Sequence, residues 1–194
     1  MKKTILIPCL LWLAGCVTPP TPVKPESGEQ LVGDRLTITL DGSWNHIIAG
    51  PAQPADHWTM EGLPIDDLQI YSGIKDGQAI HPVVRGSSAK PMVFHSTMQP
   101  DEIVSLFEGM LTRDGSTFQL VKSEPATFGG IKGYHFEFKV VRKVDSVELS
   151  GLGYGAVSNG ELFSIVYTAP RMTFFGRYQA RVEGIAQGAR IKGI

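Results

Sequence analysis

The sequence is almost without cysteine, since its two cysteines, Cys9 and Cys16, both lie in the first 16 of 194 residues. No cysteine follows Cys16, so the rest of the chain can form no internal disulfide and offers neither a thiolate nucleophile nor a cysteine ligand for a metal. The absence of these groups excludes disulfide-stapled folds and cysteine-based catalysis for the folded part.

The sequence also lacks an excess of charge. Lysine and arginine number 18 against 19 aspartates and glutamates, which gives a formal net charge of −1 at pH 7. A nucleic-acid-binding protein needs clustered lysine and arginine to contact phosphates, so we expect no nucleic-acid partner. The hydrophobic content of 42% and the charged content of 19% are those of an ordinary globular protein.

Long apolar runs are missing too. The apolar stretch at residues 5–13 is interrupted by Pro8 and is far shorter than the ~20 residues that a membrane-spanning helix needs. Lys2 and Lys3 precede this stretch and small residues follow it. A basic start, a short apolar run and a small-residue cleavage site are typical of a secretory signal peptide. The sequence therefore predicts that residues 1–15 are a signal peptide.

The cleavage site Leu13-Ala14-Gly15-Cys16 resembles a bacterial lipobox. This resemblance implies that the Cys16 thiol receives a diacylglyceryl group, with or without a further acyl chain such as palmitate on its amine. Two or more acyl chains hold a protein stably to a membrane. The chain is then a cell-envelope lipoprotein facing the periplasm, and Val17 in place of aspartate favours the outer over the inner membrane. The alternative is an ordinary signal peptide that happens to end before Cys16.

The next stretch is rich in proline and predicts a tether, which with the lipidated cysteine covers residues 16–30. Fourteen residues at ~3.1 Å each would reach ~43 Å if fully extended. The folded body could then stand clear of the lipid headgroups. Residues 31–194 are expected to form a single domain.

The first half of this domain shows short strand patterns. Alternation at residues 36–40 predicts a half-buried strand, and residues 44–48 continue extended after a turn at Asp41-Gly42. Residues 58–62 and 68–74 predict two more strands. Residues 81–91 carry several breakers and predict a long surface loop.

The second half combines helices and a meander. Residues 92–95 predict a strand, Pro100 begins a helix with an apolar stripe, and residues 118–124 predict a strand that Pro125 stops. Three strands follow near 134–140, 147–157 and 161–169, and then a final amphipathic helix. The expected fold class is α+β, a twisted and mainly antiparallel sheet with two amphipathic helices.

The order of these elements resembles the PsbP-like α/β/α sandwich. The resemblance covers residues 92–194 and includes "FGGIKGYHFEFKV", the hairpin at Asn159-Gly160 and "FSIVYTAP". Residues 58–80, "WTMEGLPIDDLQIYSGIKDGQAI", also resemble a recurring stretch of uncharacterised proteobacterial lipoproteins. Neither resemblance brings catalytic residues, and PsbP-like domains act mostly as binding or assembly modules, which implies a non-enzymatic role.

Five histidines are the candidates for metal or acid–base chemistry, but none has a metal-ligand spacing. They are His46, His57, His81, His95 and His135. The nearest approach to a cluster is Asp56-His57 with Asp66-Asp67, beside which the fold could bring His46. The competing interpretation is that these are solvated loop residues. We expect no metal and no cofactor.

Two further motifs are weak. Ser87 and Lys90 have the spacing of a serine–lysine pair but sit beside Gly86 and Pro91 without the required helix. The alternating glycines of residues 151–155 do not match a phosphate loop and instead predict a closely packed or strongly twisted sheet face, for example under a helix.

Three functions follow as hypotheses. The favoured one is a lipid-anchored, non-catalytic module that binds or assembles with another envelope protein, with Trp44, Trp58 and Tyr71 as a candidate aromatic surface. The second is a periplasmic carrier with a small-ligand pocket between sheet and helices. The third is an enzyme that uses Asp66, Asp67 and His57, which must then lie within hydrogen-bond reach of each other in a cleft.

Overall fold

The computed structural model describes residues 23–48, 53–82 and 90–193. The predicted signal peptide, Cys16 and Ser87 lie outside these residues. The elements are β1 (Val23–Val32), β2 (Leu36–Ile47), β3 (Asp56–Thr59), β4 (Asp67–Ile74), α1 (Pro100–Leu111), β5 (Thr117–Phe128), β6 (Ile131–Val141), β7 (Glu148–Ser158), β8 (Glu161–Pro170), the short π-helix η1 (Arg171–Phe175), α2 (Gly176–Gly188) and β9 (Arg190–Ile191). No helix among them is long and apolar enough to cross a membrane.

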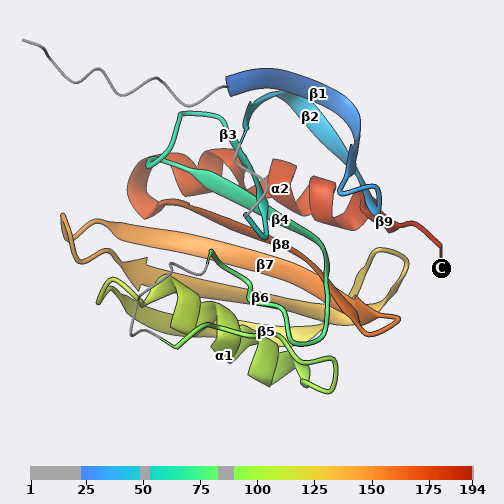
Figure 1. Cartoon of the computed structure of the whole chain (residues 1–194). Helices are drawn as coiled ribbons and strands as arrows, with labels where there is room; N and C mark the ends of the chain where they lie inside the picture. Colours follow the sequence, from blue (N-terminus) through green and yellow to red (C-terminus); the bar gives the residue numbers. More distant parts are fainter. Residues whose placement is uncertain (1–22, 49–52, 83–89, 194) are drawn as a thin grey trace, which may run out of the picture.

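One sheet organises the molecule, with strand order β1-β2-β3-β4-β8-β7-β6-β5 and β9 paired to β2. Every pairing is antiparallel. The two helices lie on opposite faces (Figure 1). This arrangement confirms the predicted α+β fold class.

Alternation along the central strands divides the core in two. Ile165 of β8 packs into the cluster that contains Val182 of α2, whereas the next residue, Val166, packs into the cluster that contains Phe107 of α1. Successive side chains of a strand point to opposite faces, so one strand supplies both interfaces. Because β8 is covered on both faces, it is apolar along nearly its whole length, as buried strands are.

The predicted tether is too long, because its second half is part of the sheet. β1 begins at Val23 and pairs with β2 from Val23 opposite Ile47 to Val32 opposite Leu36. The side chains of β1 are mostly exposed, and an edge strand that buries little carries no hydrophobic period for sequence reasoning to detect. Six residues, 17–22, therefore separate Cys16 from the sheet.

Three local predictions are also corrected. Residues 92–95 form only an isolated bridge, Val93 with Ala79. β2 continues through Asp41-Gly42, where Gly42 has a positive φ of 79°. β5 runs past Pro125, which is tolerated because β5 is an edge strand and its missing N–H can face away from β6.

The alternating glycines of β7 make room for aromatic rings from the neighbouring strand. A Cβ on Gly151 would lie 2.2 Å from Phe138 Cζ, and a Cβ on Gly153 would lie 2.2 Å from Phe136 Cε1. Phe136 in turn stacks on Phe107 of α1, with 5.9 Å between the ring centroids. The expectation of close packing at these glycines is confirmed, with rings of β6 and then α1 as the covering layer.

Candidate functional site

Two of the acid–base candidates, His57 and Asp67, form a hydrogen-bonded pair in the described part of the chain. His57 Nδ1 lies 2.8 Å from Asp67 Oδ1, and each side chain is about one-fifth exposed, at 22% and 21%. Burial of the ring disfavours its charged form, but the hydrogen bond and the charge of Asp67 outweigh burial and raise the pKa of His57. The pair comes together because His57 in β3 is the register partner of Gln69 in β4.

Asp67 also begins a polar chain that leads into the core. Gln69 Nε2 donates to Asp67 Oδ2 over 2.7 Å, and Tyr71 Oη donates to Gln69 Oε1 over 2.8 Å. Tyr71 is buried under α1 and lies 3.3 Å from Met110 Sδ. Burial, with the negative charge of Asp67, strongly raises the pKa of Tyr71, which therefore stays protonated. Sequence reasoning missed Gln69 and Tyr71, although period-two spacing from Asp67 places all three on one strand face.

Asp66 does not join this pair, because adjacent residues at the start of a strand point to opposite faces. Its buried carboxylate accepts hydrogen bonds from Thr59 Oγ1 at 2.5 Å, Met60 N at 2.9 Å and Glu61 N at 2.8 Å. These bonds close the turn at residues 60–65. Asp66 is thus a structural residue, and the predicted trio of Asp66, Asp67 and His57 is reduced to the two that meet.

His46 lies in a separate group. Its ring stacks on Trp58 at 4.2 Å between centroids and lies 3.4 Å from Glu26 Oε2 and 3.6 Å from Asp56 Oδ1. Burial raises the pKa of Glu26, but hydrogen bonds from Lys24 and Trp58 and the neighbouring His46 outweigh it and lower the pKa overall. The group ties β1, β2 and β3 together.

The remaining histidines are dispersed. His81 is buried beside Pro82, and His95 is exposed near Asp76. His135 is buried and stacks on Tyr154, with 4.2 Å between the ring centroids. Within the described ranges no group of three or more His, Cys, Asp and Glu side chains could hold a metal ion.

The candidate aromatic surface is wrong. Trp44, Trp58 and Tyr71 are 0%, 2% and 1% exposed and belong to the core. Trp44 makes edge contact with Tyr167 at 6.4 Å between centroids, so its ring faces α2 and the sheet. Each large aromatic ring removes a large apolar area from water when it is buried, and this favours its packing into the core.

One hollow of about 410 Å³ has a mainly polar lining. It opens where the β1–β2 turn meets β4 and the start of β8, and its lining includes Arg35, Ser72, Lys75 and Glu161. Arg35 Nη2 donates to Glu161 Oε2 over 2.5 Å. The carrier hypothesis placed a pocket between the sheet and the helices, but in the described residues apolar clusters fill both interfaces.

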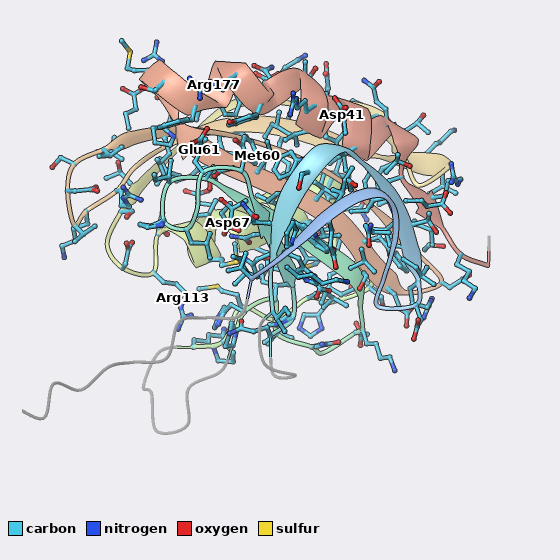
Figure 2. The ribbon with its side chains drawn as sticks, turned by 90° about the horizontal axis from the view of Figure 1, so that it is seen from above. Asp41, Met60, Glu61, Asp67, Arg113 and Arg177 are labelled. Carbon is cyan, nitrogen blue, oxygen red and sulfur yellow. The ribbon has the colours of Figure 1, made fainter. Side chains whose placement is uncertain are left out.

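Glu61 links the 60–65 turn to the start of α2. Its carboxylate lies 3.1 Å from Arg177 Nη1 and accepts a short hydrogen bond from Tyr178 Oη. Figure 2 shows Glu61, Arg177 and Asp67 at the same end of the molecule, with Asp41 further along it.

A scan against family models and a search of curated proteins each give no match. Among solved structures the chain is similar to cyanobacterial PsbP (CyanoP) from Synechocystis sp. PCC 6803, with a TM-score of 0.56 and 13% identity over 92% of this chain and 98% of that one. The chain has the PsbP-like fold. The predicted resemblance is confirmed and extends well beyond residues 92–194.

A second similar structure is LpqN of Mycobacterium tuberculosis, a protein involved in cell envelope biogenesis. Its TM-score is 0.49 and its identity 13%, over 88% of this chain and 90% of that one. At these identities the PsbP-like likeness describes the fold and gives no role to any residue.

Proposed function

We propose that this protein is a bacterial cell-envelope lipoprotein, anchored through Cys16, whose folded part binds or helps to assemble another envelope protein without catalysing a reaction. The observation that carries the proposal is the lipobox-like Leu13-Ala14-Gly15-Cys16 at the end of a short signal-like run. Two or more acyl chains on one residue are sufficient for stable anchoring. We place the protein on the periplasmic side, with Val17 favouring the outer membrane.

The non-catalytic part of the proposal is supported by how the acidic residues are used. The Asp66 carboxylate forms hydrogen bonds that hold the 60–65 turn, and the Asp67 carboxylate is hydrogen-bonded to His57 and Gln69. Neither His57 nor Asp67 lines any of five hollows formed by the described residues, so none of these five would hold a substrate against the pair.

The test is expression of the chain with its leader, followed by intact-mass analysis and membrane fractionation. We expect a mature chain that begins at Cys16, carries acyl chains and sediments with membranes. The Cys16→Ser variant should be released in soluble form, and Val17→Asp, which keeps Cys16, should remain membrane-bound. A free Cys16 thiol or a retained leader in the wild type contradicts the anchor.

The binding role is tested in the same cells by cross-linking. A partner that co-purifies with the wild type should be lost or reduced for Cys16→Ser, because release from the membrane lowers the local concentration of the two proteins. His57→Gln should leave cross-linking unchanged. A measurable reaction that depends on His57 would contradict the non-catalytic proposal.

A second candidate function is favoured by the hollow at Arg35 and Glu161. Its volume of about 410 Å³ lies within the usual range for small-ligand sites. Two cations, Arg35 and Lys75, beside one carboxylate would suit a small polar molecule that carries an acidic group. Native mass spectrometry of gently purified protein should show a bound small molecule that is lost in Arg35→Ala, and ligand-free spectra would remove this candidate.

A further inference from the structure

Exposed apolar side chains gather at one end of the sheet. Met172 of η1 is 92% exposed and Val144, between β6 and β7, is 83% exposed. Leu63 and Ile65 of the 60–65 turn and Val23 at the start of β1 are also exposed. Exposed apolar residues that cluster in this way usually mark an interaction surface.

Contacts show that these segments adjoin each other. Arg142 Nη1 donates to the carbonyl oxygen of Pro64 over 2.9 Å, which joins the β6–β7 turn to the 60–65 turn. Arg171 of η1 lies 2.8 Å from Glu148 at the start of β7. Val23 and Leu63 line one shallow hollow of about 270 Å³. We call this surface the near end. In Figure 1 the β6–β7 turn lies at the left edge of the molecule and the start of β1 lies higher, at the top.

The opposite end of the sheet is built from the turns at Gly33, Gly130 and Gly160. It holds the polar hollow with Arg35 and Glu161. The two ends are separated by the length of the strands, which is ~40 Å for a 12-residue strand such as β2.

The chain leaves the sheet at the near end, a short distance from Cys16. Six residues separate Cys16 from Val23, so the two Cα atoms can be at most ~25 Å apart. Acyl chains on Cys16 therefore hold Val23 close to the membrane surface. The far end lies a further strand length away, so it could reach the same depth only if the strands lay along the bilayer plane.

We propose that the near end rests on the bilayer that holds the Cys16 acyl chains, with Val144, Met172, Leu63 and Ile65 placed among the lipid headgroups. The proposal rests on the proposed lipid anchor. Arg142, Arg171 and Arg177 at this end are each paired with a carboxylate, on Asp145, Glu148 and Glu61. The contact thus depends on apolar insertion and does not require anionic lipid. The polar hollow at the far end then faces away from the membrane.

The test is amide hydrogen exchange of the lipidated full chain in phosphatidylcholine vesicles, with mature Cys16→Ser protein and the same vesicles as the unanchored reference. We expect exchange at residues 60–65 and 142–147 to slow at least about fivefold on anchoring, because headgroups cover these turns. The turns at Gly130 and Gly160 should exchange as in the reference. Equal slowing at both ends, or none at either, overturns the proposal.

A matched pair of variants tests whether insertion of the apolar side chains causes the slower exchange. Val144→Asp with Met172→Asp should abolish the slowing while flotation with vesicles persists, because the lipid anchor is intact. Leu31→Asp, at an exposed leucine of β1 beside the Gly33 turn of the opposite end, should keep the slowing. Slowing that survives in the Val144→Asp/Met172→Asp protein contradicts apolar insertion.

Failure of the anchor is distinguishable from failure of the orientation. A chain whose mass shows no lipid refutes the proposed anchor. The orientation is then tested on mature protein coupled through the Cys16 thiol to a maleimide phospholipid, with the same exchange readout. Protection confined to the near end supports the orientation for that attachment point, and uniform exchange rejects it. A lipidated chain with uniform exchange keeps the anchor and loses the orientation.

Discussion

Asp66 shows how much local structure can depend on one carboxylate. Its side chain is 1% exposed and accepts three hydrogen bonds, two of them from backbone amides of the 60–65 turn. Its neighbour Asp67 is partly exposed and serves a different face of the sheet. The sequence presents the two residues as a pair, and only the geometry separates a turn-forming aspartate from one that meets a histidine.

We expect Asp66→Ala to lower the free energy of unfolding by about 3 kcal/mol, because three donors lose their acceptor inside the protein. Asp67→Ala should cost about 1 kcal/mol, since its partners can turn to water. Urea unfolding followed by circular dichroism measures both. Equal losses for the two variants would contradict the structural assignment of Asp66.

The His57–Asp67 pair makes stability depend on pH in a defined direction. Because the pKa of His57 is raised in the folded state, its contribution is fully present below the ordinary histidine pKa and is lost as pH rises through the raised value. Between about pH 5.5 and about pH 8.5 the wild type should therefore lose about 1 kcal/mol more stability than His57→Gln. Urea unfolding at the two pH values measures the difference.

His95 provides the control for this prediction. It lies 3.7 Å from Asp76 and both side chains are more than half exposed, at 55% and 62%. Exposed pairs contribute little to stability. His95→Gln should therefore follow the wild type at both pH values, and a change as large as that of His57→Gln would show that the pH dependence does not come from the His57–Asp67 pair.

At the scale of elements, β7 and β6 pack closely because β7 has glycines where β6 presents aromatic rings. The glycines at 151, 153 and 155 leave space that the rings of β6 fill. Glycine in a strand interior weakens the strand itself, so its repeated use here reflects the space that the neighbouring rings occupy.

Gly153→Ala should destabilise the protein by about 3 kcal/mol, because the new methyl group would overlap Phe136 and force ring or backbone to move. Gly184→Ala in α2 is the matched control. A Cβ there meets nothing within 4 Å, so this change should stabilise by about 0.5 kcal/mol or more through helix propensity. Thermal unfolding of both variants decides between a packing effect and a general cost of losing glycine.

The elements that sequence could predict are those that bury one face. β6, α1 and the first part of β2 show a clear period in their apolar residues, and β6 and the start of α1 lie close to the predicted positions. β1 and the end of β5 could not be expected, because they lie at the edges of the sheet and contain proline. Both strands pair with the next strand along the chain, but most of their side chains are exposed, so they show no apolar alternation that would predict a strand.

The candidate site also has a part that the sequence could predict and a part that it could not. Cross-strand register brings His57 next to Asp67, and the sequence suggests only that the two could meet. Gln69 and Tyr71 follow from strand spacing once β4 is known. The hollow at Arg35 and Glu161 joins residues 126 positions apart, and this contact depends on β8 lying beside β4 in the sheet.

At the scale of the whole molecule, β1 is part of the folded body, and this can be tested by truncation. A chain that begins at residue 23 should fold, whereas one that begins at residue 31 should aggregate, because β2 loses its partner along most of its length and exposes a long edge. Size-exclusion chromatography and circular dichroism compare the two. A 31–194 chain that is monomeric and folds cooperatively would show that residues 23–30 are a linker and not a part of the folded body.

The register of β1 on β2 also determines how the protein responds to mechanical force. Nine aligned residue pairs run from Val23 to Val32, with one bulge between Glu26 and Gly28. When a chain fixed at Cys16 is pulled by a load at the opposite end of the sheet, the tension acts along β1, so these backbone bonds share the stress in shear and must rupture together. Detachment under tension is then governed by the rate of crossing an unfolding barrier. The strand that would connect the body to the proposed Cys16 anchor is thus arranged to withstand pulling along its own axis.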